Sequence, residues 1–548
     1  MNGVVFNSYV AEQMNFDQFE GAFVFPTIPG VYRGGIGTID FASLYPTAIR
    51  CGNISPETYV GKVLIQRKDD AGNLLPINKK DEPNFNIFDD SIAKSKNIVG
   101  YQLMLKNGQI KQVTLDWLRD MVNTKCIYNP NNTLFLKHEV KTGIVPLWCK
   151  FYYANRKATK KKMLACYHTL HNPEEVAKLT EEQKKKIETD EENYNSTQLG
   201  FKSMINSIYG CMGNKFSAIA DPNLAQSVTR LGKFCNTSTQ AFMRTLFEEL
   251  YNVPKDYIPV VGMDTDSIFC NLKCISDEMI KKYGLGSKVR EWPKKYRKEL
   301  WDTMSNLVET RINPYVRNLV HDYCKSNKHE LLTYELEYMS SDAIYESKKH
   351  YLAHLIFNEG DYVDYDKCTG IELKKTVVPK EMKKFLAEIY DGVVNKYWTE
   401  SEYQNYICNL YDRFSKFSVD EIAFWRGYNS ERDAIGFLQM AVGTTGTAKA
   451  VTYYNQIIDK MGLGKKYETI EVGNKIRQVC VKPSNRYGID TLAYKPGQWP
   501  KEFNEVFEVD YKTMFKKIIR DPLKRFREAC HFEDTDPSKQ AQFDIFSI

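Results

Sequence analysis

Three aspartates lie where their carboxylates could share metal ions. Asp40 is near the end of a strand-like run from Val31 to Phe41, and Asp264 and Asp266 flank one threonine in YIPVVGMDTDSIFCNL. The apolar runs around DTD predict a strand, a tight turn and a second strand. Two carboxylates on such a turn, with a third from a neighbouring strand, could hold two magnesium ions about 4 Å apart. Such a site is suited to phosphoryl transfer.

The DTD tripeptide alone is weak evidence, because turns are rich in Asp and a solvated turn explains it. Its neighbours favour a functional site. The acids follow the apolar run from Ile258 to Val261, where unpaired charge would be costly.

A cluster of basic residues stands out because the net charge of the whole chain is only +6. Five cations crowd into seven positions: Arg156, Lys157, Lys160, Lys161 and Lys162. They lie in a helical pattern over about 146–170, and a second pattern spans about 180–210 after the HNPEE turn. We expect an antiparallel helix pair that projects from a sheet. A solvated helix face explains the cations as well as a polyanion contact does.

Length and composition bound the architecture. A chain of 548 residues is too long for one hydrophobic core, and 43% hydrophobic with 13% aromatic residues is typical of a folded protein. No apolar run approaches the roughly 20 residues that cross a bilayer, and the N-terminus does not look like a signal peptide. We therefore expect a cytoplasmic protein without a membrane partner. The thirteen cysteines are scattered and form no zinc set, which favours reduced thiols.

Three segments resemble the A, B and C motifs of family B DNA polymerases. They are DFASLYPT at 40–47, KSMINSIYG at 202–210 and DTDS at 264–267. Further segments look most like the T-even-phage replicative branch: NISPET, IVPLW, NRKATKKKM, KKHY, GIELKKTVVPK and the C-terminal QFDIFSI. The resemblance covers nearly the whole chain. It implies an α+β multidomain protein with a right-hand architecture, in which a palm with an antiparallel sheet carries helical-pair fingers and a thumb.

The resemblance also implies domain boundaries. The palm takes 1–145, with an insertion at about 62–125, and 214–371; the fingers take 146–213, the thumb 372–539, and a clamp-binding tail 540–548. The insertion has no assigned role. Protein-primed relatives carry an insertion in this interval, so a protein-primed polymerase remains an alternative.

Residue roles follow from the same motifs. Asp40 and Asp266 match the metal-bridging carboxylates, Asp264 is the accessory acid, and the Phe41 carbonyl would face the second ion. The resemblance implies two Mg²⁺ ions, for which Mn²⁺ could substitute. Glu337 matches a further acid near the metals, although Glu335 lies close and a surface pair explains both.

The incoming nucleotide has its own set of expected contacts. Ser43 and Leu44 would present backbone N–H groups to the triphosphate. Tyr45 matches the steric gate that excludes a 2′-hydroxyl. Three cations would converge on the triphosphate when the helix pair closes, with Lys202 also counted as catalytic: Arg156, Lys160 and Lys202. The nascent base pair would be lined by Asn206, Tyr209 and Gly210.

Primer and template contacts complete the expected site. Lys348, Lys349 and Tyr351 match the KKRY motif, and Thr265 and Ser267 would lie near DNA. The sequence departs from the family at Met263, where Gly is usual, and at His350, where Arg is usual. The first departure could change the packing of the turn, and the second could weaken the grip on the primer.

Two partners are expected besides primer–template DNA and deoxynucleoside triphosphates. Only about twenty residues precede EGAFVFPTIPGVY, which ordinarily follows an exonuclease, so we expect no 3′–5′ exonuclease in this chain. A split phage or viral gene would supply it as a separate subunit, and a truncated chain is the alternative. After the polar linker EDTDPSKQ, a QxxFxxF pattern resembles a sliding-clamp tail: Gln540, Phe543, Ile545 and Phe546. A tail that folds back on the thumb is the alternative.

The predicted function is therefore template-directed extension of a primer 3′-hydroxyl, in a replicative role. A DNA-binding polymerase relative without activity is a rival from another class. The joint presence of Asp40, Asp266, Tyr45, Arg156 and Lys202 argues against that rival.

Overall fold

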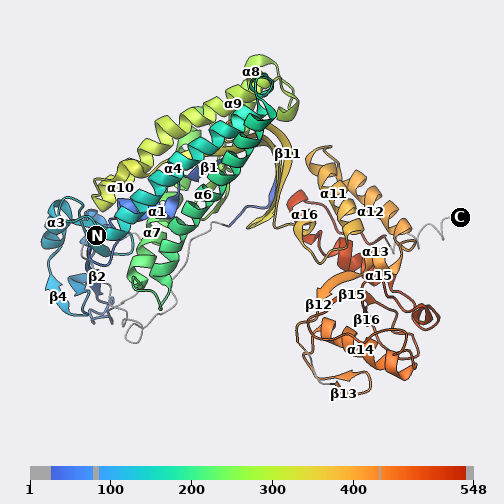
Figure 1. The fold of residues 1–548 in the computed structure, drawn as a ribbon. Coiled ribbons are helices and arrows are strands. Elements are labelled where there is room, and N and C mark those ends of the chain that lie inside the picture. The colour runs from blue at the N-terminus through green and yellow to red at the C-terminus, as the bar shows by residue number, and fades with distance from the viewer. Residues whose placement is uncertain (1–25, 78–84, 431–433, 538–548) are drawn as a thin grey trace. The chain divides into compact units, whose positions relative to one another are not determined.

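The computed structural model describes residues 26–77, 85–430 and 434–537 (Figure 1). Helices and sheets are mixed along the chain, and the strand ladders with a defined register are antiparallel. This confirms the predicted α+β composition. The right-hand arrangement and the boundaries of palm, fingers and thumb remain predictions.

The chain forms two compact units. The first takes residues 37–270 and 298–337, and the second takes 26–36, 271–297 and the residues from 338 onward. Each unit has a core of buried aliphatic and aromatic side chains. All three aspartates of the expected metal site belong to the first unit.

A six-stranded sheet carries the aspartates. Its strand order is β11-β10-β9-β1-β8-β7. The bounds are β1 (Gly30–Phe41), β7 (Val260–Asp264), β8 (Ser267–Asn271), β9 (Tyr334–Ser347), β10 (His350–Asn358) and β11 (Asp361–Thr369). Asp264 pairs with Ser267, so β7 and β8 form a two-residue hairpin whose turn is Thr265–Asp266. The predicted strand, turn and strand are confirmed.

Two long helices run side by side in the first unit (Figure 1). They are α4 (Ile144–His171) and α6 (Glu181–Gly213), joined through the short α5 (Pro173–Val176). A capping box between Thr180 and Gln183 starts α6. At the start of α4, Glu57 accepts the Ile144 backbone N–H. Both helices begin and end within one turn of the predicted positions.

A third long helix, which is largely buried, packs against α6 of the helix pair. α7 (Pro222–Tyr251) begins with Asp221 as its N-cap and Pro222 in its first turn, a favourable start. It packs against α1 (Leu44–Cys51), the short helix that follows β1. A Cβ atom on Gly232 would lie 2.8 Å from Leu44 Cδ2, so a larger residue there would force the Leu44 side chain of α1 to shift.

The insertion at 62–125 contributes to a five-stranded sheet of order β4-β3-β2-β6-β5. The strands are β2 (Tyr59–Arg67), β3 (Ile98–Leu105), β4 (Ile110–Val113), β5 (Cys126–Tyr128) and β6 (Thr133–Leu136). Two helices accompany them, α2 (Asp90–Ala93) and α3 (Leu115–Thr124). Since β2 begins before the insertion and β6 follows it, the insertion and its flanks share one sheet. The described residues between β2 and β3 form turns and irregular segments together with α2.

The first and second units contain the remaining helices and short strands. α8 (Lys273–Tyr283) belongs to the second unit, α9 (Lys294–Leu307) crosses the division, and α10 (Asn313–Cys324) belongs to the first. From residue 380 the second unit has α11 (Lys380–Val394), α12 (Glu400–Phe414), α13 (Val419–Ile422), α14 (Gly446–Lys460), α15 (Tyr511–Phe515) and α16 (Lys524–Cys530). A sheet of order β12-β15-β16 packs among them: β12 (Phe424–Gly427), β15 (Lys475–Cys480) and β16 (Thr491–Tyr494). β13 (Ala434–Gly436) and β14 (Gln439–Met440) form a small hairpin.

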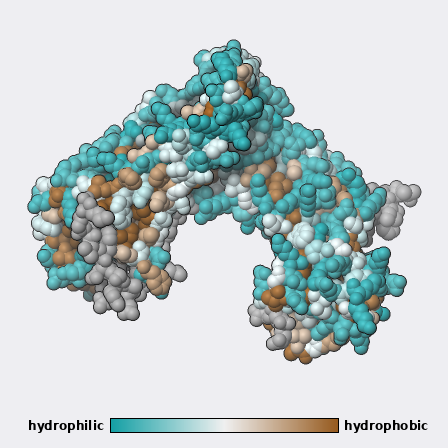
Figure 2. All heavy atoms as spheres, viewed as in Figure 1, coloured by the Kyte–Doolittle hydropathy of each residue, from teal (hydrophilic) through white to brown (hydrophobic). Residues whose placement is uncertain are grey.

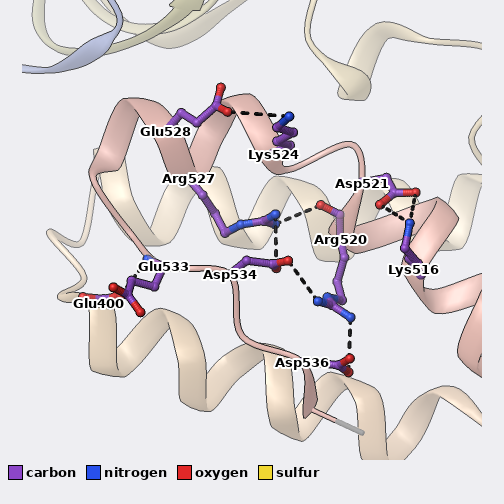
Figure 3. A network of polar contacts seen from close by, with 10 residues as sticks. All are labelled: Glu400, Lys516, Arg520, Asp521, Lys524, Arg527, Glu528, Glu533, Asp534 and Asp536. Carbon is purple, nitrogen blue, oxygen red and sulfur yellow. Dashed lines mark hydrogen bonds and ion pairs between the residues drawn. The ribbon is translucent and has the colours of Figure 1, made fainter. Parts of the chain in front are cut away.

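Ion pairs hold the described part of the expected polar linker. Asp534 contacts Arg520 at 2.9 Å and Arg527 at 3.1 Å, and Asp536 contacts Arg520 at 3.2 Å (Figure 3). The Glu533 backbone N–H donates to Glu400 on α12. Residues 533–537 are thus bound to the second unit, which corrects the expectation of a plain linker. Residues 538–548, with the expected clamp contacts Gln540, Phe543, Ile545 and Phe546, lie outside the described residues.

The face in Figure 2 is mostly hydrophilic, with apolar side chains in smaller groups. In the described part of the chain, no helix combines the length and the apolar character that a membrane crossing requires.

A buried carboxyl in the second unit gives a pH-dependent stability. Glu346, on β9, accepts a hydrogen bond from the Tyr390 hydroxyl on α11. Burial is the main cause that raises the Glu346 pKa to about 7. Because the folded-state pKa exceeds the unfolded value, the stability from the neutral form is complete below about pH 4.5 and is lost as pH rises through 7.

We expect Glu346→Gln to remove this loss, since glutamine stays neutral. The free energy of unfolding of the variant minus that of the parent chain should be roughly 2 kcal/mol larger at pH 8 than at pH 5. Thermal melts at both pH values measure the difference. A difference between variant and parent that is the same at pH 5 and pH 8 would contradict the prediction.

Candidate active site

The hairpin of β7 and β8 brings Asp266 next to Asp40. The Phe41 backbone N–H donates to the Asp266 carbonyl at 3.0 Å, and the Ser267 hydroxyl donates to Asp40 Oδ1 at 2.7 Å. These two bonds place Asp40, at the end of β1, against the hairpin turn. The sequence predicted the pairing of the two acids. It expected Ser267 near DNA, whereas the structure assigns its hydroxyl to Asp40.

Negative charge accumulates at this turn. The pKa of Asp40 is raised to about 7, first by burial, then by the charge of Asp266 and, to a smaller extent, by Glu337 and Glu335. The Ser267 hydrogen bond opposes this rise. Burial also raises the pKa of Asp266, and Asp264 and Glu337 add to the effect, while the charge of Lys202 lowers it. Asp264, Glu335 and Glu337 thus add negative charge around Asp40 and Asp266, and Lys202 opposes this charge at Asp266.

The acids fit a pair of hard divalent cations. Magnesium prefers oxygen ligands and usually takes one or two carboxylates, with water and substrate phosphates completing its coordination. Asp40 and Asp266 supply such a pair. Among residues 26–77, 85–430 and 434–537, no group of three or more His, Cys, Asp or Glu side chains is arranged to hold a metal. In this part of the chain the acids at the turn therefore form a pair, Asp40 and Asp266, and Asp264 does not complete a set of three grouped ligands.

The turn between the acids is conformationally unusual. Thr265 has a φ of 33°, a value that β-branched residues rarely adopt. Such a conformation costs on the order of 1–3 kcal/mol and persists only where the surroundings determine it. The Thr265 carbonyl accepts a 2.9 Å hydrogen bond from Asn236 Nδ2 on α7. The hairpin is thus held on one side by β1 and on the other by α7.

Two basic residues of the helix pair act on the start of α1 and on the acidic turn. Arg156 Nη1, on α4, donates to Ser43 Oγ at 3.3 Å. Its Nε is buried without a hydrogen-bond partner in the described residues, a polar group that a ligand could satisfy. Lys202, on α6, is exposed and acts electrostatically on Asp266. Lys160 is half-buried on α4, and the other cations of the basic cluster are exposed: Lys157, Lys161 and Lys162.

The start of α1 can accept an anion. Ser43 is its N-cap, with a left-handed φ of 61° and no side-chain cap hydrogen bond. The first backbone N–H groups of a helix have no intrahelical partner, so those of Leu44 and Tyr45 are directed outward from the helix start. Arg156 contacts the Ser43 hydroxyl at the same place, which adds positive charge to the N-terminus.

Two tyrosines face each other between α1 and α6. The ring centroids of Tyr45 and Tyr209 are 4.5 Å apart. Burial raises the pKa of Tyr45 to about 12, and the nearby Tyr209 and Asp266 contribute. Tyr45 is therefore neutral at physiological pH. Asn206 is exposed one turn before Tyr209, and a Cβ on Gly210 would meet no atom within 4 Å, so local packing does not require glycine there.

The expected primer contacts lie in the second unit. Lys348 and Lys349 form the turn between β9 and β10, and Lys349 has a φ of 59°. Tyr351 is only 7% exposed, and its hydroxyl lies 3.2 Å from that of Tyr338. Its ring stacks on Tyr345, so the structure places Tyr351 in the core of this unit, although the sequence predicts a primer contact.

Some supporting residues were not predicted. The Tyr334 hydroxyl donates to Asn236 Oδ1 at 2.6 Å. The sequence did not predict these two residues, because neither lies in a recognisable motif. The hydrogen bond from Ser267 to Asp40 joins residues far apart in sequence. Only the position of Ser267 directly after an acid could have hinted at it.

The chain belongs to DNA polymerase family B. The model of that family matches residues 1–299, which is more than half of the chain. The match includes the three aspartates, the helix pair and α7.

Curated relatives agree. The DNA-directed DNA polymerase of Enterobacteria phage T4 is 23% identical over an alignment that covers 99% of this chain and 59% of that protein. The enzyme of Escherichia phage RB69 is 23% identical, over 100% of this chain and 60% of its own length. The DNA polymerase delta catalytic subunit of Drosophila melanogaster is 23% identical over 49% of this chain and 18% of that protein. The chain spans about three fifths of the length of the two phage relatives.

The Ser267 hydrogen bond leads to a test of the metal site. Protons and divalent ions compete for Asp40, so the affinity for Mn²⁺ should fall as pH drops through about 7, the Asp40 pKa. Ser267→Ala removes the bond that lowers this pKa. The midpoint of the affinity against pH should therefore move to higher pH in the variant.

Calorimetric titration with Mn²⁺ between pH 5.5 and 8.5 measures both curves. Ser276→Ala, a buried serine on α8 whose hydroxyl donates to the Lys273 carbonyl, is a matched control and should leave the midpoint unchanged. A midpoint in Ser267→Ala that equals or lies below that of the parent would contradict the assignment.

Proposed function

We propose that this chain is a template-directed DNA polymerase that extends a primer 3′-hydroxyl with deoxynucleoside triphosphates. The observation that carries the proposal is the pairing of Asp40 with Asp266 at the turn between β7 and β8, in a chain of family B. The curated relatives named above are DNA polymerases, which supports the same activity.

Asp40 and Asp266 would hold two divalent ions, Mg²⁺ or in its place Mn²⁺, with Asp264 and the Phe41 carbonyl as further ligands. When bound, such ions activate the attacking hydroxyl and neutralise the triphosphate and its leaving group. The high proton affinity of Asp40 in the metal-free chain supports this role, because a site that disfavours its own negative charge gains most from a cation.

The triphosphate would bind between α1 and the helix pair. Arg156, Lys160 and Lys202 would contact its oxygens, and the backbone N–H groups of Ser43 and Leu44 would receive the anion at the start of α1. Arg156 is already held there by Ser43, so part of the ordering is complete before substrate arrives.

The ring of Tyr45 would lie under the sugar and exclude a 2′-hydroxyl. Its contact with Tyr209 supports the ring from the other helix. Asn206, Tyr209 and Gly210 would line the nascent base pair, and the open space at Gly210 is compatible with a close approach of the bases. Recognition by shape suits an enzyme that copies any sequence.

Contacts with DNA complete the proposal. Lys348 and Lys349 would bind the primer backbone, with Thr265 nearest the acids. A replicative role and a sliding clamp that binds the tail at 540–548 belong to the proposal on the ground of sequence alone. The right-hand arrangement of palm, fingers and thumb belongs to it on the same ground.

A primer-extension assay with Asp266→Asn tests the proposed activity. The substitution keeps the size of the side chain but removes a metal-binding charge. Extension of an annealed DNA primer should fall at least about a hundredfold, because metal ions supply several kcal/mol of transition-state stabilisation. Asp277→Asn is the control. This exposed acid pairs with Lys273 on α8, and its substitution should leave the rate of primer extension unchanged.

An Asp266→Asn variant that extends primers as fast as the parent would instead support a DNA-binding relative without this chemistry. A parent chain that fails to extend an annealed primer but starts from a protein hydroxyl would support the protein-primed alternative.

A further inference from the structure

The turn that carries Asp266 depends on residues outside the three motifs. Thr265 holds a left-handed conformation, and its carbonyl points to Asn236 Nδ2 at 2.9 Å. Asn236 lies in the middle of α7 and is 3% exposed. A carbonyl oxygen only accepts hydrogen bonds, so the amide must present its N–H₂ group to Thr265. Its oxygen is then left to accept from another donor.

Tyr334 is that donor. Its hydroxyl donates to Asn236 Oδ1 at 2.6 Å, which fixes the orientation of the amide. Tyr334 is itself 1% exposed, and its backbone exchanges two hydrogen bonds with the side chain of Asn313, at 2.7 and 3.1 Å. Asn236 therefore has little freedom to turn away from the hairpin.

Tyr334 also contacts the residue that follows Asp40, the second acid of the pair. The ring of Tyr334 packs on Phe41 with 3.9 Å between centroids, and Phe41 follows Asp40. The Phe41 N–H donates in turn to the Asp266 carbonyl. A closed circuit thus runs from Asp40 through Phe41, Tyr334, Asn236 and Thr265 to Asp266. Phe41, Tyr334 and Asn236 are buried on two strands and a helix of the first unit, and Thr265 and Asp266 form the half-buried turn.

We propose that Asn236, oriented by Tyr334, is a positioning residue that sets the separation of Asp40 and Asp266 for divalent ions. The inference rests on the proposed function of these two acids. Asn236 touches neither substrate nor metal; it acts through the Thr265 carbonyl. Without its amide, Thr265 has no restraint from α7, and the turn can relax toward a commoner conformation that moves the Asp266 carboxylate.

The test measures Mn²⁺ binding by the chain without nucleotide or DNA, alongside primer extension. In Asn236→Leu the dissociation constant for Mn²⁺ should rise about tenfold or more, the range found when supports of metal ligands are removed. kcat should fall by a similar factor, whereas KM for the nucleotide should change little, because the triphosphate contacts lie on α1, α4 and α6. Tyr334→Phe keeps the bond to Thr265 and should show a smaller effect in the same direction.

Asn131→Leu is the matched control. Asn131 is fully buried and its amide donates to Ser227, which lies on α7 as Asn236 does, but none of its hydrogen bonds among the described residues reaches the hairpin. It should lower the melting temperature and leave Mn²⁺ affinity unchanged. A folded Asn236→Leu with the parent's Mn²⁺ affinity overturns the inference, as does an equal loss of affinity in Asn131→Leu.

Should Asn236→Leu fail to fold, Tyr334→Phe decides: unchanged Mn²⁺ affinity and kcat overturn the inference, and a loss of both supports it. The proposed function fails separately, in a parent chain that neither binds Mn²⁺ nor extends a primer, and the inference then fails with it.

Discussion

Repulsion between carboxylates in a partly buried place is the constraint on which the first unit depends. Asp40 and Asp266 approach each other where water is limited, and Glu337 adds to the field. Like charges in such surroundings favour protons or cations. The backbone bond between β1 and the hairpin holds the acids there in spite of their repulsion. The folding energy of the surrounding sheet and helices thus holds two carboxylates in a place that disfavours their charged forms.

The positive groups stand on different elements from the acids. Arg156 and Lys202 project from α4 and α6, which have few buried side chains over most of their length. The acids, in contrast, lie on strands and a turn supported by the buried α7. Few buried contacts permit local motion, and many resist it. The proposed metal ligation would therefore rest on the rigid part of the unit, and the proposed triphosphate binding on the part with fewer buried contacts.

How far the sequence predicts this site depends on how local the signal is. The hairpin and the helix pair were predicted because apolar runs, helical patterns and turns follow one another within short windows. The approach of Asp40 to Asp266 was predicted only because both lie in recognisable motifs. Asn236 and Tyr334 were missed, since an asparagine within a helix and a tyrosine at a strand start have no local pattern that distinguishes them.

The remaining differences have the same cause. The acids after Phe532 have a linker's composition, and their binding to Arg520 and Arg527 depends on a fold that brings distant residues together. Tyr351 matches a primer-binding motif, but the rings of Tyr338 and Tyr345 surround it in the folded chain. A motif identifies a residue type at a position; its exposure is decided by the packing of other segments.

The five-stranded sheet limits how the chain can be shortened, because residues 62–125 supply strands to its centre. β2 is the central strand of β4-β3-β2-β6-β5, and it pairs with β3 inside the insertion and with β6 after it. Excision of 62–125 would remove most of β2 and all of β3, and would leave the β5–β6 pair as an isolated hairpin with an unprotected edge. Residues 62–125, the predicted insertion, thus share one sheet with the residues on either side, and a chain shortened there would need a different strand in the place of β2.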